Sequence, residues 1–345
     1  MLASLHRAGH RMEELTAGRD AAERAEGSRF LTRVIAAMTE LYMEQDPQYP
    51  SLARIMTPTR KFYGDNPDTL YDRLSLRPDL SYRLHGRRGN DLYLAFCVYG
   101  LQGTRNVILA NVSDRELRCG DDGRFELVLS AQPPAQGGNW LPLAANARSM
   151  VVRQYFADHR AMEPAKLEVE LVGNVPPPAP PSPKEVAWRL RALGEAVERT
   201  LDNTATATSA WMARPNAISV ESDAAGLASL FPTPDNRYVG GWYRLEENQA
   251  LEITARAPAA RYWSAQLWSR WLESREYRRQ QVSLNHTRLR PEPDGSFRIV
   301  VAHRPPGTPN WLDTGGHREG CVALRWLLAE QAPPVPVFRV VPLPT

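Results

Sequence analysis

The chain has 345 residues, of which 43% are hydrophobic and 23% charged, a composition typical of a folded protein with room for two cores. Its formal net charge is +3, and its arginines are interleaved with acidic residues rather than gathered in one block, which argues against a nucleic-acid partner. Cys97, Cys119 and Cys321 lie far apart with no metal-ligand spacing, so neither disulfides nor structural zinc are expected.

The amino-terminal part, residues 1–60, is expected to be helical. It contains no apolar stretch of signal-peptide length, and no later run approaches the ~20 residues of a membrane span. We therefore expect a cytoplasmic protein without a membrane partner. Apolar residues recur at helical spacing from Phe30 to Tyr42, which predicts an amphipathic helix over residues 20–45 that ends before Pro47.

A polar segment opens the first expected β-sandwich unit, residues 61–175. It crowds hydroxyl, carboxylate and amide groups into a turn-rich stretch: Tyr63, Asp65, Asn66, Asp68 and Tyr71. Turns favour Asp, Asn, Gly and Pro, so a plain loop explains much of this composition. The tyrosines suit a pocket wall that binds a ligand or donates a proton. Tyr63 and Asp65 are therefore candidate catalytic residues, and the other three are candidate ligand-binding residues.

Two stretches of the chain, one in each half, can be aligned with each other. "DDGRFELVLSAQPPAQGGNWL" from Asp121 aligns with "PDGSFRIVVAHRPPGTPNWL" from Pro293, and "YLAFCVYG" from Tyr93 aligns with "YWSAQLWS" from Tyr262. The matches occur in the same order in both halves of the chain. We infer an internal duplication of a unit of about a hundred residues.

Each copy is expected to be rich in strands. An Asp-Gly turn leads into a run with period-2 alternation, Phe125 to Leu129 in the first copy and Phe297 to Val301 in the second. Other short runs of β-branched and aromatic residues are bounded by Gly, Pro, Asn and Asp. The expected fold is mainly β (α+β), with two duplicated jelly-roll-like β-sandwich units, each preceded by helices.

A linker separates the two copies, over residues 176–235. It begins with a Pro-rich stretch that should be stiff and extended. Ser182, followed by Pro183 and Glu185, predicts a capped helix start, and a shorter helix is expected around residues 223–230. The second unit then covers residues 236–345.

The second copy resembles a known family in its ordered motifs. These are "RYWSAQLWS", "PDGSFRIVV", the "NWL" turn and the closing "LRW" strand, over roughly residues 236–341. They resemble the domain of unknown function 1214 family. "GDNPDTLYDRLSL" from Gly64 is similar to a signature of its companion, the domain of unknown function 1254. The resemblance implies β-rich, jelly-roll-like domains and implies no activity.

Residues shared by both copies are best explained by folding. We expect Trp140 and Trp311 to close one end of each sandwich, with Asn139 and Asn310 bonding the backbone of the turn. Arg325 and its counterpart in the first copy fall near the middle of a closing strand. An inward-pointing arginine needs a polar partner, so Arg325 is a candidate for structural pairing or for anion binding.

Polarity that only one copy carries is a stronger indication of function. After the Asn-Trp turn the first copy reads "LPLAANARS", whereas the second reads "LDTGGHREG" and so adds Asp313, His317 and Glu319. His303 stands where the first copy has Ala131. A histidine oriented by a carboxylate can act as a general base. The alternative is that the loop residues are simply solvated and His303 is a satisfied core histidine.

Other chemistries lack their sequence patterns. The second-copy loop has no HxH or HExxH, so no metal site is expected. No Gly-x-Ser-x-Gly elbow and no phosphate-binding or dinucleotide-binding glycine pattern occurs, and no cofactor is expected.

The tryptophans of the second copy point to a ligand. Alternation sends Trp263 and Trp268 to opposite faces of their strand, so both cannot fill one core, and we expect them to contribute to ligand binding. Our leading hypothesis is a cofactor-independent small-molecule enzyme that acts by acid-base chemistry as a hydrolase, lyase, isomerase or cyclase. Its substrate would be a sugar, a polyol or a bulky hydrophobic molecule. The alternative is a non-catalytic ligand-binding or assembly protein, and a homo-oligomer is compatible with both.

Overall fold

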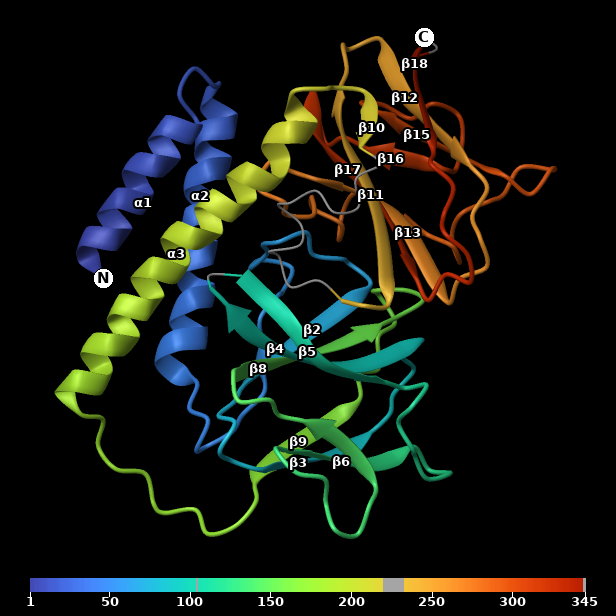
Figure 1. Ribbon diagram of the computed structural model, residues 1–345. Helices are drawn as coiled ribbons and strands as arrows, with labels where there is room; N and C mark the ends of the chain where they lie inside the picture. The colour runs from blue at the N-terminus through green and yellow to red at the C-terminus, as the bar shows by residue number, and fades with distance from the viewer. Residues whose placement is uncertain (104, 220–232, 344–345) are drawn as a thin grey trace. The chain divides into compact units, whose positions relative to one another are not determined.

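The computed structural model describes residues 1–103, 105–219 and 233–343. The chain forms two compact units (Figure 1). Unit 1 contains Met1–Arg60 and Asp68–Asp202, and unit 2 contains Lys61–Pro67 and Asn203–Thr345. The short segment 61–67, which the sequence analysis assigned to the first sandwich, thus groups with unit 2. The helix expected around residues 223–230 falls outside the described residues.

Helices precede the first sandwich and connect it to the second. They are α1 (Leu2–Leu15), α2 (Ala21–Thr39), the π-helical turn η1 (Glu40–Glu44) and α3 (Pro183–Met212). Asp20 caps α2 by accepting a hydrogen bond from Glu23 N at 2.9 Å, and Ser182 Oγ accepts one from Glu185 N at 3.1 Å at the start of α3. Both helix starts predicted from the sequence are confirmed.

The strands of unit 1 form one five-stranded and one four-stranded sheet, with the orders β1-β2-β8-β4-β5 and β7-β6-β3-β9. Their bounds are β1 (Ala53–Arg54), β2 (Thr69–Ser75), β3 (Tyr82–Arg87), β4 (Tyr93–Gln102), β5 (Arg105–Ser113), β6 (Arg124–Ser130), β7 (Asn139–Pro142), β8 (Ala147–Tyr155) and β9 (Lys166–Leu171).

The strands of unit 2 repeat this arrangement, with the orders β10-β11-β17-β13-β14 and β16-β15-β12-β18. Their bounds are β10 (Ala217–Ser219), β11 (Asn236–Arg244), β12 (Gln249–Ala255), β13 (Tyr262–Trp268), β14 (Ser283–Asn285), β15 (Phe297–Ala302), β16 (Trp311–Asp313), β17 (Glu319–Leu327) and β18 (Val337–Pro342).

The two sandwiches have the same topology. Each strand of unit 1 has a counterpart nine strands later in unit 2, and the sheets contain these counterparts in the same order. One strand pair in each unit is parallel, β6 with β7 and β15 with β16, and the other pairs between named strands are antiparallel. The predicted fold of two duplicated β-sandwich units is therefore confirmed.

Each unit has its own hydrophobic core between its two sheets. In unit 2, Trp263 lies in this core and its ring packs 4.8 Å from that of Phe297. Trp268, five residues along β13, lies in a separate cluster with Trp211 and Trp242. The alternation predicted from the sequence thus places the two tryptophans on opposite faces of the strand.

The Asn-Trp turns have the same structural role in both units. Asn310 accepts a hydrogen bond from Arg290 N at 2.9 Å and donates to Arg290 O and Arg298 O. Asn139 makes the equivalent three bonds in unit 1. Trp311 Nε1 donates to Ala302 O at 3.1 Å. These bonds tie the turn to neighbouring backbone, as predicted.

A buried carboxylate lies on the four-stranded sheet of unit 2. Glu252 on β12 accepts hydrogen bonds from Arg339 at 2.5 Å and from Arg298 at 2.8 Å. The bond from Arg339 and then that from Arg298 lower the pKa of Glu252, against the opposing effect of burial.

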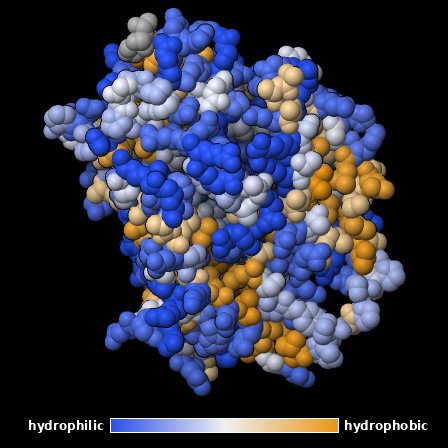
Figure 2. All heavy atoms as spheres, turned by 180° about the vertical axis from the view of Figure 1, so that it is seen from behind, coloured by the Kyte–Doolittle hydropathy of each residue, from blue (hydrophilic) through white to orange (hydrophobic). Residues whose placement is uncertain are grey.

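Exposed hydrophobic side chains are scattered. On the face seen in Figure 2, hydrophobic residues form separate areas in a mainly hydrophilic surface. The most exposed large ones include Leu2, Trp188 and Val337. No helix in the described ranges is both long enough and apolar enough to cross a membrane.

Candidate functional site

The polar side chains of unit 2 gather on the outer face of its five-stranded sheet, the face that points away from the sandwich core. Trp263, Ala265 and Leu267 of β13 point into the core, so Ser264 and Gln266 between them point outward. We define the outer face by six buried or half-buried residues. They are Tyr238, Ser264, Gln266, Ser283, Asn285 and Arg325.

Strand register arranges these residues in two rows. Ser264 pairs with Arg325 on β17 and with Asn285 on β14, and Gln266 pairs with Ser283. Tyr238 on β11 extends the first row, because it pairs with Arg325. Directly opposed residues in an antiparallel sheet have Cβ atoms about 4.5–5.5 Å apart. Each row therefore brings its polar groups within reach of one small molecule.

The segment 61–67 lies on the outer face. Its backbone carbonyls accept hydrogen bonds from side chains of the sheet: Asp65 O accepts from Gln266 Nε2 at 3.0 Å and from Trp268 Nε1 at 2.9 Å. Gly64 has φ +74°, and a Cβ there would come within 2.9 Å of the Trp268 ring. Glycine thus permits both the left-handed turn and the close approach of the segment to the sheet.

Asp65 anchors this segment through its side chain. One carboxylate oxygen accepts from Ser274 N at 2.7 Å and the other from Ser274 Oγ at 2.6 Å. Lys61 donates to Ser274 O at 2.8 Å and to Arg275 O at 3.1 Å. Asn66 bonds the Tyr262 hydroxyl, with 3.1 Å between Asn66 Nδ2 and Tyr262 Oη. Asp65, predicted as a catalytic residue, therefore holds backbone in place.

Arg325 is held rigidly within the first row. Its Nη2 donates to Gly64 O at 3.0 Å, and its guanidinium lies over the rings of Tyr238 and Trp268 at 5.5 and 5.8 Å from their centres. Only 3% of the residue is exposed. A guanidinium stacked between two rings keeps a fixed orientation, which suits recognition of a ligand oxygen.

Three buried oxygens on the outer face have no hydrogen-bond partner among the described residues: Ser264 Oγ, Gln266 Oε1 and Ser283 Oγ. Their residues are 0%, 1% and 3% exposed. Gln266 uses its amide nitrogen on Asp65 O, which fixes the side-chain orientation and leaves Oε1 as an acceptor. An unsatisfied buried polar atom costs about 1–3 kcal/mol. Hydrogen bonds from ordered water or from a ligand would remove this cost.

The first copy carries less polar residues at two of these three positions. The alignment of "YLAFCVYG" with "YWSAQLWS" places Ala95 opposite Ser264 and Cys97 opposite Gln266. The register agrees, because Ala95 pairs with Arg153 as Ser264 pairs with Arg325. The scaffold folds with alanine and cysteine here, so the Ser and Gln of unit 2 are additions to what the fold requires.

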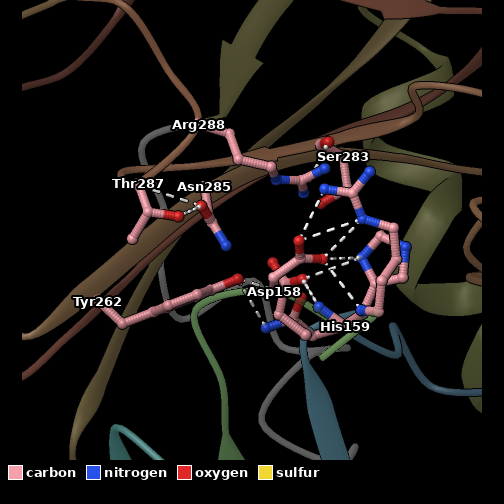
Figure 3. Close-up of polar contacts among 10 residues, drawn as sticks. Asp158, His159, Tyr262, Ser283, Asn285, Thr287 and Arg288 are labelled. Atoms are coloured by element: carbon pink, nitrogen blue, oxygen red, sulfur yellow. Dashed lines mark hydrogen bonds and ion pairs between the residues drawn. The ribbon is translucent and has the colours of Figure 1, made fainter. Parts of the chain in front are cut away.

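Two side chains that follow β14 donate hydrogen bonds to residues of this strand. Thr287 Oγ1 donates to Asn285 Oδ1 at 2.7 Å, and Arg288 Nη2 donates to Ser283 O at 3.1 Å (Figure 3). These contacts orient the Asn285 amide and fix the end of the strand.

The histidines predicted as general bases lie elsewhere in unit 2. His303 Nδ1 is 2.8 Å from Thr314 Oγ1 and its Nε2 is 3.3 Å from Leu245 O, so its ring contacts a hydroxyl and a carbonyl. His317 is half-buried in the following loop, where its backbone N–H bonds Thr314 O. No bond joins His303 to a carboxylate among the described residues.

The two predicted carboxylates also have structural contacts. Asp313 accepts a hydrogen bond from Gly315 N at 2.7 Å, which closes the turn after β16. Glu319 accepts from Trp242 Nε1 at 3.2 Å and from Arg244 Nε at 2.7 Å. Tyr63 is half-buried beside the Trp268 cluster, with φ +56°. The catalytic roles suggested for these residues stay predictions.

Two predicted ligand-binding residues belong to unit 1. Asp68 is fully buried, and its Oδ1 accepts hydrogen bonds from the backbone N and from Nδ1 of His159, both at 3.2 Å. Tyr71 is buried on β2, in register with Arg153. Sequence reasoning selected Asp68 but missed His159, which is 91 residues away.

Sequence reasoning also missed Ser264, Gln266 and Ser283. Serine and glutamine are common surface residues, so their identity gives no signal. The internal alignment did carry one, because two of these positions hold alanine and cysteine in the first copy. Among the described residues, no group of three or more His, Cys, Asp and Glu side chains is arranged to hold a metal ion.

A chain that repeats one sandwich of a five-stranded and a four-stranded sheet is a tandem β-sandwich protein. The family model described as "Protein of unknown function (DUF1214)" matches residues 68–159 and 228–331. The chain belongs to this family. One model matches both halves, in agreement with the duplication, and the resemblance of the first half to the companion domain stays a prediction.

Solved structures extend this comparison. An uncharacterised protein from Burkholderia cenocepacia is 32% identical, with a TM-score of 0.93, over 99% of this chain and 95% of that one. A protein from Vibrio parahaemolyticus shares the fold at 13% identity and a TM-score of 0.52, over 91% of this chain and 98% of that one. The comparison with curated proteins gave no match.

Proposed function

We propose that the outer face of unit 2 binds a small hydroxyl-rich molecule, a sugar or a polyol. The observation that carries the proposal is a set of three buried oxygens to which the described residues give no hydrogen-bond partner: Ser264 Oγ, Gln266 Oε1 and Ser283 Oγ. Left unsatisfied, they would cost on the order of 3–9 kcal/mol in total. That is a large share of the 5–15 kcal/mol by which folded domains are stable.

The chemistry of these oxygens selects the ligand class. Gln266 Oε1 only accepts, so its partner must donate an O–H or N–H. A serine hydroxyl can both donate and accept, and Arg325 only donates. A ligand with several hydroxyl groups meets all three demands, because each hydroxyl donates one hydrogen bond and accepts others. A bare anion cannot donate to Gln266, and an apolar ligand would leave every oxygen unsatisfied.

The test exchanges the polar residues for those of the first copy. The double variant Ser264→Ala/Gln266→Cys recreates the residues of Ala95 and Cys97. Wild type and variant are titrated with a panel of sugars and polyols, including glucose, myo-inositol and glycerol, by isothermal titration calorimetry. Binding to the variant should be at least tenfold weaker. Its free energy of unfolding should change little, because the removal of buried unsatisfied oxygens offsets the loss of the bond from Gln266 Nε2 to Asp65 O.

Ser296→Ala, in the Asp-Gly turn before β15, is the matched control and should bind like wild type. Failure of the whole panel to bind, together with a crystal structure in which only ordered water contacts the three oxygens, would contradict the proposal.

Acid-base catalysis on such a molecule remains the further hypothesis from the sequence. The suggested groups are His303 or His317, with Asp313 or Glu319 as the orienting carboxylate. The buried oxygens of the outer face support ligand binding without a catalytic group, so ligand binding is the function that the geometry supports best.

A further inference from the structure

We propose that the five-stranded sheet of unit 1 binds a small oxyanion, a phosphate or a carboxylate group, through the guanidinium of Arg73. Arg73 lies on β2 and points away from the core of the sandwich, because the next residue, Leu74, belongs to that core. Arg73 is half-buried, so solvent still reaches the residue. This site is separate from the proposed sugar or polyol site of unit 2.

The strands beside Arg73 supply no counter-charge. Its register partners are Ala53 on β1 and Val151 on β8, both of them buried. Their apolar side chains can pack along the stem of the arginine but cannot neutralise its charge. Nη1 of Arg73 donates to Ser75 Oγ at 3.0 Å, and no carboxylate of the described residues forms an ion pair with the guanidinium. The serine hydroxyl orients the group and leaves its charge uncompensated.

This charge is held at a cost. Burial lowers the pKa of Arg73, because the surrounding protein removes water from the guanidinium, and the opposing effect comes from the hydroxyl of Tyr42 on η1. The arginine stays protonated, since its pKa remains far above neutral pH. The folded chain thus keeps a partly desolvated cation, and a bound oxyanion would offset the lost hydration with charge-assisted hydrogen bonds. Short π-helical turns such as η1 are frequent at functional sites.

Other polar groups surround Arg73 on the same side of the sheet. Its diagonal neighbours on β8 are Ser149 and Arg153, at the distance of about 7–8 Å that is usual for such positions. Ser149 pairs directly with Ser75, so two serine hydroxyls lie beside the guanidinium. Arg153 brings a second positive charge to this side of the sheet. Guanidinium and hydroxyl groups both donate hydrogen bonds, which phosphate and carboxylate oxygens accept.

The second copy shows that the sandwich does not need these polar groups. With Arg153 aligned to Arg325, strand register gives each residue of β2 and β8 a counterpart in unit 2. The counterparts of Arg73, Ser75 and Ser149 are, in this order, Gly240, Trp242 and Cys321. The same topology therefore forms with glycine, tryptophan and cysteine in these places. The arginine and the two serines of the first copy go beyond what the fold requires.

The experiment titrates the full chain with inorganic phosphate and, separately, with acetate, by isothermal titration calorimetry at constant ionic strength. Constant ionic strength separates binding at a site from general screening of charge. We expect saturable binding to wild type, and the anion that binds identifies the group that the site accepts. Arg73→Gln should bind at least tenfold more weakly, because charge-assisted hydrogen bonds are lost. Arg118→Gln is the matched control: it removes the same charge from an exposed position of unit 1 and should bind like wild type.

A second measurement needs no variant. A crystal structure of wild type with the anion that binds should show one of its oxygens within hydrogen-bond distance of Arg73 Nε or Nη2. An anion bound only elsewhere would overturn the proposal. So would the absence of saturable binding of both anions to wild type, or wild-type affinity in Arg73→Gln. None of these results bears on sugar or polyol binding at Ser264 and Gln266, so the two proposals fail independently.

Discussion

Replacing Gly64 with alanine tests how the segment 61–67 is fixed to the sheet of unit 2. Gly64 has φ +74°, and an added Cβ would lie 2.9 Å and 3.0 Å from two atoms of the Trp268 ring. The left-handed conformation costs a non-glycine residue roughly 1–2 kcal/mol. Overpacking a filled site adds about 1–3 kcal/mol. We therefore expect Gly64→Ala to lower the free energy of unfolding by about 2–5 kcal/mol.

The ring cannot easily move to make room. Trp268 is 2% exposed, and its Nε1 is bonded to Asp65 O at 2.9 Å. If the segment shifts instead, the bond between Gly64 O and Arg325 is weakened. Gly64→Ala should therefore also weaken the proposed binding of a sugar or polyol at the outer face.

Gly316→Ala is the matched control. Gly316 belongs to the same unit and has φ +82°, but no atom lies within 4 Å of its added Cβ. It should lose only the conformational part, roughly 1–2 kcal/mol. Urea unfolding followed by tryptophan fluorescence measures both variants, since seven of the nine tryptophans lie in unit 2. If Gly64→Ala is no more destabilising than Gly316→Ala, the packing of this segment against Trp268 is wrong.

Three further predictions concern stability and reactivity. Asn310→Ala should lower the free energy of unfolding in urea by about 2–4 kcal/mol, because three hydrogen bonds to backbone are lost. Asn139→Ala should lower it by less, since water can reach that half-buried turn. Equal losses in the two variants would contradict this explanation. Glu252 has a lowered folded pKa, so its contribution to stability is complete above its ordinary pKa of 4.5 and is lost as the pH falls through the lower folded value. Below pH 4.5, the free energy of unfolding of Glu252→Gln should therefore fall less steeply with pH than that of wild type. Parallel curves for the two proteins would show that Glu252 does not contribute in this way. Cys119 is exposed while Cys321 is buried, and burial raises the pKa of the Cys321 thiol. Native protein should therefore react with Ellman's reagent at one thiol, and native Cys119→Ser at none. Wild type in denaturant should react at three.

Local sequence signals predicted much of the fold. The cap at Ser182 needs only residues within one helical turn, so it could be predicted from the sequence. Period-2 alternation likewise separated Trp263 from Trp268, because side-chain direction in a strand depends on position alone. The duplication was visible because both copies kept their turns in the same order.

The polar sites were harder to identify from the sequence. His303 and Asp313 stood out as ionisable residues in one copy, but the structure gives them contacts with Thr314 and Gly315. Ser264 and Ser283 stand out only once register has placed them in adjacent rows and burial has removed water from their oxygens.

The sequence by itself thus determined the repeat, the strand character and the places where helices begin, since each depends on interactions between near neighbours in the chain. Only the tertiary structure decided that Asp65 bonds Ser274, 209 residues away, and that Asp68 bonds His159, 91 residues away. Contacts over such separations depend on which strands pair and in what register. That choice is made by burial of the whole core, and no local pattern of residues records it.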